Sequence, residues 1–334
     1  MSCLDKFHIL EINNLSVSFT QYAGRTKREE LPVISNLNVS VHEGEIVAVV
    51  GASGSGKSLL AHAILGLLPG NARWSGELFF LEEELDEERM KRVRGREIAL
   101  VPQSVNYLDP LMKVGSQVRG EKKSGERKRR QRGLFQKYGL DLETEERYPF
   151  QCSGGMSRRI LLSTALMEEP RLLIADEPTP GMELAMAKKA MEDFRRFADE
   201  GNGVLLITHD IELALEVADR IAVFYAGTTV EEALAGDFAS EDMLRHPYTK
   251  ALWRAMPQNG FQVIEGSQPY VKELPKGCVF GPRCPQFSSE CEGEIPERIV
   301  RCGTVRCVKC RGDASPHLHR KYTNKNEEDR YAGS

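Results

Sequence analysis

Hydrophobic and polar residues alternate along the first fifty positions of the chain and then give way to longer apolar runs. The segments 10–19 and 31–45 show the period-two alternation of half-buried strands. The run at 46–50 is apolar throughout, as in a strand that is buried on both faces of a parallel sheet. A glycine-rich loop follows it, and the sequence then predicts a helix over 57–68 that ends at Pro69.

The strand-then-helix pattern returns in the second half of the chain. Apolar runs predict further strands at 171–175, 204–207 and 221–224. Between the first two of these, apolar residues from Met186 to Ala198 recur at the spacing of one helix face. Strands that alternate with helices indicate an α/β fold with a parallel sheet.

Changes in composition divide the chain into segments. Residues 1–235 carry the strand and helix pattern, interrupted at about 104–165 by an insertion that is richer in charge and in helix-forming residues. We interpret 236–265 as a linker, because the apolar periodicity fades there, and 266–313 as a small cysteine-rich module. The polar residues 314–334 predict a disordered tail.

The overall composition is that of an ordinary folded protein. Of the 334 residues, 41% are hydrophobic and 28% are charged, and the net charge of −4 gives no general reason to expect nucleic-acid binding. No apolar stretch approaches the ~20 residues of a membrane span, and the amino-terminal residues lack the apolar core of a secretory signal, which predicts a cytoplasmic protein. The basic run 126–132, with Lys122 and Lys123 nearby, fits a solvated helix face, attraction to anionic lipid headgroups or contact with DNA, in that order.

The segment Gly51–Ser58 fits the pattern G-x-x-x-x-G-K-[ST] and lies where that pattern binds phosphate, between a buried strand and a helix. Its glycines let successive backbone N–H groups face phosphate oxygens, and the helix adds the positive end of its dipole. Lys57 can reach the β- and γ-phosphates and Ser58 can offer a hydroxyl to Mg²⁺, which predicts ATP and Mg²⁺ as ligands. The candidate nucleotide-binding residues in this loop are Gly51, Ser53, Gly54, Ser55, Gly56, Lys57 and Ser58.

Two acidic residues follow the apolar run at 171–175. Because ligands of α/β proteins bind at the carboxyl ends of the strands, Asp176 and Glu177 are expected at the same edge of the sheet as the phosphate loop. Asp176 would hold Mg²⁺ through water. Glu177 would orient and partly deprotonate the water that attacks the γ-phosphate.

The segment Cys152–Met156 resembles the LSGGM-type signature of ABC ATPases, with Cys152 in place of the usual leucine. Together with the phosphate loop and the acidic pair, it falls in the order of that family over about 1–230. The resemblance implies a nucleotide-binding domain with a mainly parallel sheet, an antiparallel β subdomain and an inserted helical subdomain. It also implies that the signature turn, made of Ser153, Gly154 and Gly155, holds the γ-phosphate of an ATP bound to a second subunit.

The same resemblance assigns roles to three more residues. Gln103 looks like the glutamine that contacts Mg²⁺ or the lytic water, and His209 looks like the switch histidine that contacts the γ-phosphate. Phe19 is similar in position to the aromatic residue that stacks on adenine, although Tyr22 competes for this role and plain core packing explains Phe19 nearly as well. The candidate catalytic residues are Glu177, His209 and Gln103, and the candidate Mg²⁺ ligands are Ser58, Gln103 and Asp176.

One segment departs from the family pattern. After Glu177-Pro-Thr the family usually continues with a small residue and Ala-Leu-Asp, whereas this chain has the segment Pro180–Glu183. Glu183 can stand in for the aspartate that joins the two nucleotide sites of the dimer, but the change can also impair one site. A non-hydrolysing regulatory subunit is therefore an alternative, against which the intact Glu177 and His209 speak.

Elements beyond the ATPase core resemble a narrower family. Tyr225–Gly227, His246–Leu252, Leu274–Phe280 and Pro282–Pro285 look like marker elements of the ATPases of oligopeptide, dipeptide and nickel importers. The resemblance implies a peripheral subunit at the cytoplasmic face of the membrane, driving import of peptides or of nickel and other metal chelates. Its partners would be a related second ATPase in a heterodimer, two permease subunits and an extracellular substrate-binding protein. A DNA-repair ABC ATPase is the weaker alternative, because such proteins insert their zinc modules or long coiled coils inside the ATPase core.

Six of the eight cysteines lie between Cys278 and Cys310, which in a reducing compartment indicates metal ligation before disulfides. Some members of the importer family bind a [4Fe–4S] cluster through four such cysteines. The cysteines that resemble this ligand set are Cys278, Cys284, Cys291 and Cys307. Cys302 and Cys310 are alternatives for the fourth ligand, Zn²⁺ is the second choice of metal, and unligated thiols are the remaining interpretation.

Overall fold

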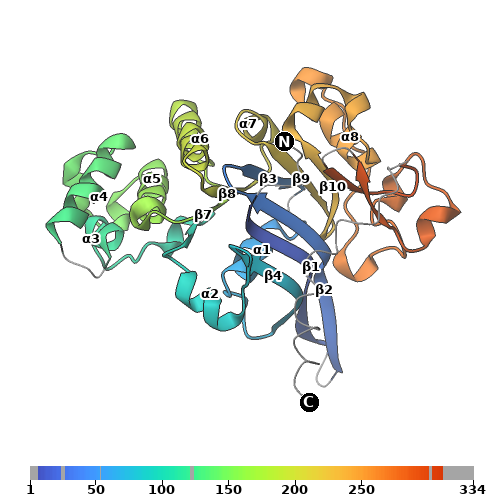
Figure 1. Cartoon of the computed structure of the whole chain (residues 1–334), viewed down its shortest axis with the longest axis horizontal. Coiled ribbons are helices and arrows are strands. Elements are labelled where there is room, and N and C mark those ends of the chain that lie inside the picture. Colours follow the sequence, from blue (N-terminus) through green and yellow to red (C-terminus); the bar gives the residue numbers. More distant parts are fainter. Residues whose placement is uncertain (1–6, 24–26, 53, 121–123, 301–302, 311–334) are drawn as a thin grey trace, which may run out of the picture.

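The computed structural model describes residues 7–23, 27–52, 54–120, 124–300 and 303–310. It contains an eight-stranded sheet, a separate four-stranded sheet and a group of helices to one side of both (Figure 1). Within the described residues, no helix is both long and apolar enough to cross a membrane.

The eight-stranded sheet is built around β3 (Ile46–Gly51), in the order β11-β12-β10-β9-β3-β8-β7-β6. The strands from β9 to β6 are parallel, whereas β9, β10, β12 and β11 pair antiparallel. The parallel strands predicted from the apolar runs are thereby confirmed. The predicted strands are β3, β7 (Leu172–Asp176), β8 (Gly203–Thr208) and β9 (Arg220–Tyr225). The parallel strand β6 (Ile98–Val101) and the antiparallel β10 (Thr228–Leu234) were not predicted.

The second sheet is antiparallel, in the order β2-β1-β4-β5. The sequence predicts short strands near the amino terminus, but two of these strands are 16 residues long. Shifts of register in the β1–β2 pairing explain the difference, because they interrupt the period-two pattern without ending the strands. Asn14 and Asn36 take positive φ angles of 53° and 48° within them. The bounds are β1 (His8–Ala23), β2 (Lys27–His42), β4 (Ala72–Phe80) and β5 (Glu83–Glu84).

The main sheet buries both of its faces, which is why β3 is apolar at every position. Ile46, Ala48 and Val50 face one core, and Val47 and Val49 face the other. Figure 1 shows α6, α7 and α8 on one side of the sheet and α1 and α2 with the antiparallel sheet on the other. The bounds are α1 (Lys57–Ile64), α2 (Glu87–Val93), α6 (Leu184–Asp199), α7 (Ile211–Leu215) and α8 (Pro247–Arg254).

The helix α1 ends at Ile64, earlier than the sequence predicts. The N–H of Gly66 donates to the carbonyl of Ala63 at 3.1 Å, and the N–H of Leu67 donates to that of His62 at 2.8 Å. This pair of bonds is a Schellman motif, which favours glycine because the chain turns through a positive φ, here 61° at Gly66. The helix is therefore closed by the glycine and not by the proline that follows.

The predicted helical insertion contains α3 (Val114–Arg119), α4 (Gly125–Lys137) and α5 (Gly154–Ala165). These helices enclose a small core of their own, separate from the two cores of the main sheet. The buried residues of this core are Leu108, Val114, Val118, Phe135, Leu140, Ile160, Leu161 and Met167.

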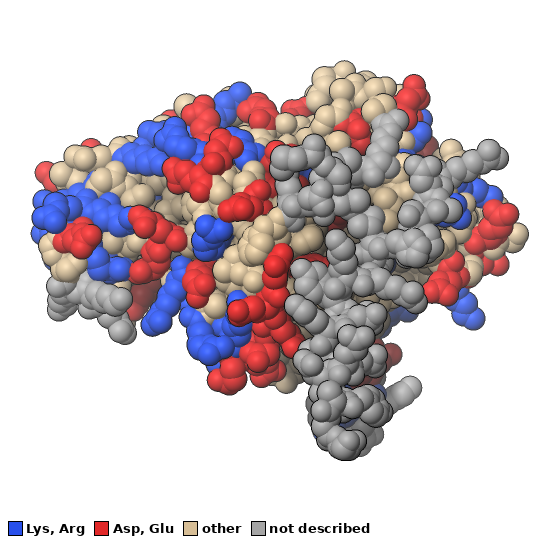
Figure 2. Space-filling model, viewed as in Figure 1, with Lys and Arg blue, Asp and Glu red and all other residues tan. Residues whose placement is uncertain are grey.

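Most basic residues of the run on α4 are paired with acidic residues. Arg127 contacts Glu168, Arg130 contacts Glu169, and Arg132 lies 2.5 Å from Glu145. Figure 2 accordingly shows basic and acidic side chains interspersed over the helical part of the molecule. Paired charges attract a lipid or nucleic-acid phosphate less than free ones, so the solvated helix face is the interpretation that the structure favours. The neighbouring Lys122 and Lys123 lie outside the described residues.

The cysteine-rich segment continues the main sheet and is not a separate module. β11 (Glu297–Val300) and β12 (Gly303–Arg306) form a hairpin that pairs with β10. They pair with it because the far side of β10 would otherwise present unpaired backbone groups at the sheet edge. The segment 236–265, interpreted as a linker, includes α8, whose Tyr248 is 2% exposed. The polar tail at 314–334 lies outside the described residues.

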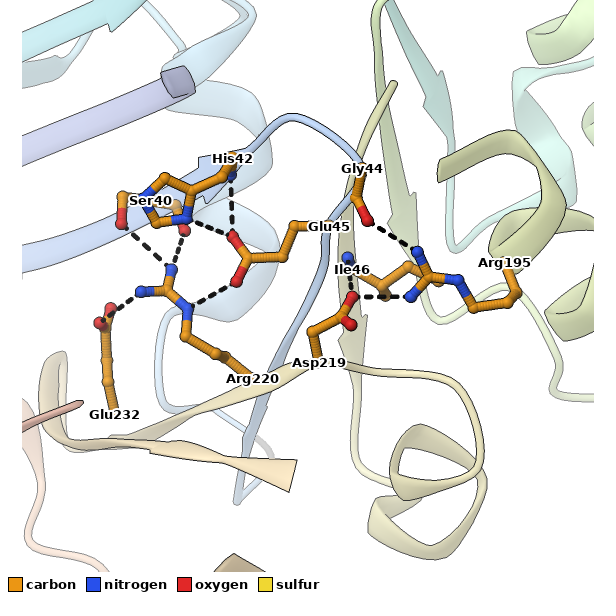
Figure 3. Close-up of polar contacts among 9 residues, drawn as sticks. All are labelled: Ser40, His42, Gly44, Glu45, Ile46, Arg195, Asp219, Arg220 and Glu232. Atoms are coloured by element: carbon orange, nitrogen blue, oxygen red, sulfur yellow. Dashed lines mark hydrogen bonds and ion pairs between the residues drawn. The ribbon is translucent and has the colours of Figure 1, made fainter. Parts of the chain in front are cut away.

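Buried charges join the two sheets at the turn from β2 into β3 (Figure 3). The carboxylate of Glu45 accepts from His42, with the ring Nδ1 at 2.6 Å, and lies 2.9 Å from Nε of Arg220 on β9. Arg220 also donates to the Ser40 carbonyl at 2.5 Å and faces Glu232 at 3.7 Å. The network therefore fixes β2 of one sheet against β9 and β10 of the other.

A second arginine fixes α6 to the same turn. Arg195 donates to the carbonyl of Gly44 at 2.7 Å and to the carboxylate of Asp219 at 2.7 Å (Figure 3). Asp219 in turn accepts from the backbone N–H of Ile46 at 2.8 Å. The first residue of β3 is thus held by charged groups that come from α6 and from the start of β9.

Replacing Glu45 by glutamine should destabilise the fold in a pH-dependent way. Burial alone would raise the pKa of Glu45, but the hydrogen bond with His42 and the charge of Arg220 outweigh it and lower the pKa from 4.5 to about 2. A lowered folded-state pKa adds stability above about pH 4.5 that is lost as the pH falls toward 2. We expect Glu45→Gln to lower the free energy of unfolding by about 3 kcal/mol at pH 7.

Urea unfolding of both proteins between pH 7 and pH 3 measures this difference, which should shrink as the pH falls. The exposed neighbour Glu43 provides the control, and Glu43→Gln should change the unfolding free energy by less than about 0.5 kcal/mol. A difference for Glu45→Gln that does not depend on pH would show that the charge of Glu45 contributes nothing.

Candidate functional site

The predicted phosphate loop runs from the end of β3 to the start of α1, and close contacts fix both of its ends. A Cβ on Gly51 would lie 2.2 Å from the carbonyl oxygen of Phe224 on β9. Gly56 has φ 98° and precedes the first helical residue, and a Cβ there would lie 3.2 Å from Cγ1 of Ile34. Glycine is required at both positions, by space at the first and by backbone conformation at the second. Ser53 lies outside the described residues.

The ammonium group of Lys57 is folded onto its own loop. Its Nζ donates to the carbonyls of Gly51 at 2.8 Å and Ala52 at 3.0 Å. Burial lowers the pKa of Lys57, and the nearby carboxylates of Glu177 and Asp176 oppose that shift. A buried cation held by two carbonyls is available to an entering anion such as a phosphate, which can replace these weaker acceptors.

Two oxygen ligands of the kind that Mg²⁺ prefers meet beside the loop. The hydroxyl of Ser58 donates to the carboxylate of Asp176 at 3.1 Å, across from α1 to the end of β7. Burial raises the pKa of Asp176, although the hydrogen bond from Ser58 acts against the rise. A divalent cation would favour the ionised carboxylate, so the donor set and its electrostatics both fit Mg²⁺.

Glu177 stands at the end of β7 in a constrained backbone conformation. Its φ is 48°, unusual for a residue with a side chain, and its N–H donates to the carbonyl of Ile207 on β8 at 2.8 Å. Its carboxylate lies 2.9 Å from Nδ1 of His209, which follows β8. The structure thus brings the predicted base and the predicted switch histidine together at one edge of the sheet.

Arg158 on α5 is a site residue that the sequence analysis missed. It donates to the backbone carbonyl of Glu177 at 2.9 Å, and burial lowers its pKa. In the sequence, Arg158 is marked only by its place on the helix that begins at the signature turn. Because surface helices commonly carry arginines, that place did not distinguish it. Its contact fixes the strained residue from the side of the helical insertion.

The signature turn lies at the start of α5. The hydroxyl of Ser153 accepts from the N–H of Met156 at 3.2 Å and so caps the helix. Gly155 faces the altered loop after β7, since a Cβ on it would lie 3.3 Å from the carbonyl oxygen of Gly181. Figure 1 shows α5 beside α3 and α4, away from α1. The turn and the phosphate loop of the same chain are therefore not brought together.

Two other predicted residues also stay apart from this group. Gln103 is exposed in the segment after β6, and within the described residues no hydrogen bond joins it to Ser58 or Asp176. Phe19 lies on β1, paired with Leu31 and Ala72, and packs partly buried against the core between the two sheets. Core packing explains the position of Phe19 in the structure. The stacking of Phe19 on adenine stays a prediction.

Four cysteines of the C-terminal segment line one small cavity, together with His246 and Phe287. Burial raises the pKa of Cys278 and Cys284, and the neighbouring thiols add to both shifts. Among the residues that the structure describes, no three or more His, Cys, Asp or Glu side chains form a group that could hold a metal ion. The lining cysteines are Cys278, Cys284, Cys291 and Cys307.

Comparisons with known proteins agree with this architecture. The ABC transporter family model matches residues 34–180, and the model of the oligopeptide/dipeptide transporter C-terminal region matches residues 230–291. The oligopeptide transport ATP-binding protein AppD of Bacillus subtilis is 33% identical over 321 residues, which cover 90% of this chain and 96% of that protein. The oligopeptide transport ATP-binding protein OppD of Salmonella typhimurium is also 33% identical, over 90% of this chain and 93% of its own length.

A solved structure of an ATP-binding cassette is also similar to this chain. The dimeric ATP-binding cassette MJ0796, in a post-hydrolysis state bound to ADP and Pi, aligns with a TM-score of 0.59 and 27% identity, over 68% of this chain and 98% of that one. Fold and site together define an ATPase of the ABC class, whose hydrolysis is coupled to transport. Within that class, the chain belongs to the family of oligopeptide and dipeptide transport ATP-binding proteins.

The close packing at Gly51 predicts a large effect for the smallest added side chain. Gly51→Ala places a methyl group at 2.2 Å from the Phe224 carbonyl, so β3 and β9 must separate locally. We expect a loss of about 2 kcal/mol or more in the free energy of unfolding, measured by urea denaturation. Gly70→Ala is the matched control, because a Cβ there meets nothing within 4 Å. Equal stability of the two variants would contradict the packing described for the phosphate loop.

Proposed function

We propose that this chain hydrolyses ATP at the loop Gly51–Ser58 and thereby drives import of peptides through membrane permease subunits. The observation that carries the proposal is the joint placement of Lys57, Ser58, Asp176 and Glu177 at one edge of the sheet. The relatives at 33% identity are named as oligopeptide and dipeptide transport proteins. We therefore favour peptides over nickel or other metal chelates as the cargo.

The loop and its neighbours would bind the nucleotide by charge and by backbone N–H groups. Lys57 would exchange its two carbonyl acceptors for β- and γ-phosphate oxygens, while Ser58 and Asp176 would hold Mg²⁺. When bound, Mg²⁺ neutralises charge on the phosphates. Gln103 would have to move toward the site to take part, because its side chain is exposed where it stands.

Glu177 would act as the general base for the attacking water. Glu177 is 6% exposed and its carboxylate is held by His209, so few orientations are open to the side chain. The bond from Arg158 to its backbone carbonyl and the bond from its N–H to β8 keep the strained conformation in place. His209 remains exposed on its other side and would contact the γ-phosphate.

A second ATPase subunit would complete each site. The turn Ser153–Gly155 is exposed or half-buried and lies apart from the phosphate loop of its own chain, so it is free to face the nucleotide of a partner (Figure 1). We favour a related chain as the partner, in a heterodimer. The loop Pro180–Glu183 lies beside this turn and is exposed except at the half-buried Met182, so its departure from the family pattern would act at the dimer contact.

The helical insertion would receive the permeases. Several large apolar side chains are exposed there, among them Leu111 at 87%, Phe150 at 74% and Tyr107 at 55%. Exposed apolar groups of this size favour a protein contact over water. The chain would then lie peripherally at the cytoplasmic face of the membrane, and an extracellular substrate-binding protein would deliver the peptide.

The C-terminal cysteines would hold a [4Fe–4S] cluster, with Zn²⁺ as the second choice. In support of this, Cys278, Cys284, Cys291 and Cys307 line one cavity and thiolates are the ligands that iron–sulfur clusters use. The ligands of a cluster bind different iron atoms and stand farther apart than the ligands of a single ion. The absence of a single-ion site among the described residues is compatible with this arrangement.

Replacing Glu177 by glutamine tests the ATPase assignment. Glu177→Gln keeps the size of the side chain but removes the base, so steady-state hydrolysis should fall by about 100-fold or more while ATP binding persists. Turnover is measured for the chain alone, with its partner ATPase, and in vesicles that carry the permeases, where peptide uptake should stop as well. The exposed Glu200 provides the control, and Glu200→Gln should leave turnover unchanged.

The outcomes separate the two functions considered for the chain. Hydrolysis that appears or rises with the partner and is lost in Glu177→Gln supports the import motor. ATP binding without turnover in any combination would overturn it and favour the regulatory subunit, with the segment Pro180–Glu183 as the cause.

Replacing Cys284 by serine tests the cysteine site. Protein purified without oxygen should contain iron and acid-labile sulfide, and Cys284→Ser should lose most of both because one thiolate ligand is removed. Cys152 lies in the signature segment, and Cys152→Ser should keep the wild-type content. Zinc in place of iron and sulfide would support the second choice of metal. A protein that contains neither iron nor zinc would overturn the proposal.

A further inference from the structure

An ion pair joins the helical insertion to α6. Nζ of Lys137, the last residue of α4, lies 2.8 Å from Oδ1 of Asp193 on α6. The side chain of Asp193 is 3% exposed, whereas that of Lys137 is 37% exposed. Arg196, one turn further along α6, approaches the same carboxylate oxygen at 3.5 Å. Asp193 is therefore a buried carboxylate, and the nearer of these two cations comes from the insertion.

The residue that follows Lys137 enters a core of the main sheet. Tyr138, at the C-terminal end of α4, is 1% exposed and shares a buried apolar core with Met191 and Phe194 of α6. Phe135, one turn earlier on α4, packs instead in the separate core of the insertion. The ammonium group of Lys137 lies over the ring of Tyr138, 5.7 Å from its centroid. The end of α4 is thus attached beside α6 by burial as well as by charge.

Arg159 connects the same end of α4 to α5, the helix that begins at the signature turn. Its Nη1 donates to the carbonyls of Tyr138 at 3.0 Å and Gly139 at 2.9 Å. Its Nε donates to the carbonyl of Gly155, a residue of the turn itself, at 3.2 Å. A continuous set of contacts therefore runs from the signature turn through the end of α4 to Asp193.

The helix α6 is itself fixed to the main sheet, two residues beyond Asp193. Arg195 donates to the carbonyl of Gly44 and to the carboxylate of Asp219, at the turn that leads into β3. Both distances are 2.7 Å. Neighbouring side chains of α6 thus bind the insertion on one side and the sheet on the other.

The remaining contacts of α5 with the main sheet leave the angle of the insertion open. Leu162 and Ala165 pack in a core of the sheet, and apolar packing is non-directional. Arg158 adds polar contacts to the residues that follow β6 and β7. A body held at one polar point can pivot about it, so a second polar attachment on another helix is needed to fix its angle. The pair of Lys137 and Asp193 is placed to be that attachment.

We propose that Asp193 is a positioning residue for the signature turn, and that it acts through Lys137 and Arg159. A turn that meets the phosphate of a second subunit must be placed closely, because a displacement of about 1 Å far from the chemistry can cost up to about 100-fold in rate. The inference rests on the proposed function, since it assumes that the turn Ser153–Gly155 completes the nucleotide site of a partner ATPase.

Removing the buried charge tests the positioning role. In the full-length chain mixed with its partner ATPase, Asp193→Asn keeps the size of the side chain but removes the ion pair. We expect partner-stimulated ATP turnover to fall about tenfold. The Kd of a fluorescent ATP analogue for the chain alone should stay within about twofold of wild type, because α6 and α1 lie on opposite sides of the sheet (Figure 1). The adjacent, exposed Glu192 provides the control, and Glu192→Gln should change neither value.

Removing the lysine charge tests the route through α4. Lys137→Met keeps most of the side chain and changes a partly exposed position, so it tests the pair even where Asp193→Asn folds poorly. Turnover with the partner should fall in this variant too. In the double variant it should fall by less than the product of the two separate effects, because both residues act through one contact.

Four results would contradict these expectations. Wild-type turnover in both single variants, or an equal fall in Glu192→Gln, would overturn the positioning role. A rise in the Kd of the analogue that matches the fall in turnover would also overturn it, since the nucleotide site of the chain itself would then be damaged. Independent effects in the double variant would overturn the route through Lys137. A wild-type chain that shows no turnover with its partner would instead refute the proposed function, and this inference with it.

Discussion

The burial of β3 is the constraint on which the rest of this structure depends. The strand hydrogen-bonds on both sides, to β8 and β9, and its side chains are buried on both faces. A strand so enclosed must be apolar throughout and must have its polar loop at an end. The phosphate loop therefore leaves the sheet where β7 and β8 also end, which places Asp176, Glu177 and His209 beside it.

Charged groups surround the same strand at its other end. Arg220 and Glu45 connect the antiparallel sheet to β9, and Arg195 and Asp219 connect α6 to Ile46 (Figure 3). The Arg220–Glu45 pair is buried, and a buried pair contributes less by attraction than it costs to leave unpaired, so it specifies one relative placement of the sheets. With both ends of β3 fixed, the nucleotide site is a rigid edge to which the helical insertion and the C-terminal segment attach.

The C-terminal segment belongs to this rigid unit. Its hairpin adds two strands to the main sheet, and Phe280 packs against Tyr225 at the end of β9 and Tyr248 on α8. The cysteine-rich segment follows the ATPase core in the sequence, but in the folded structure it is part of the same packed unit. The helical insertion differs, because it has a core of its own and reaches the site through Arg158.

The sequence by itself determined the parallel strands, the phosphate loop and the acidic pair, because each depends on a short pattern of burial and residue type. It also indicated the class of protein, because several such patterns occur in one order. Tertiary structure alone decided that the cysteine segment extends the sheet and that Arg158 contacts the site. The reason is that these contacts join residues whose local patterns carry no trace of each other, and only the path of the folded chain brings them together.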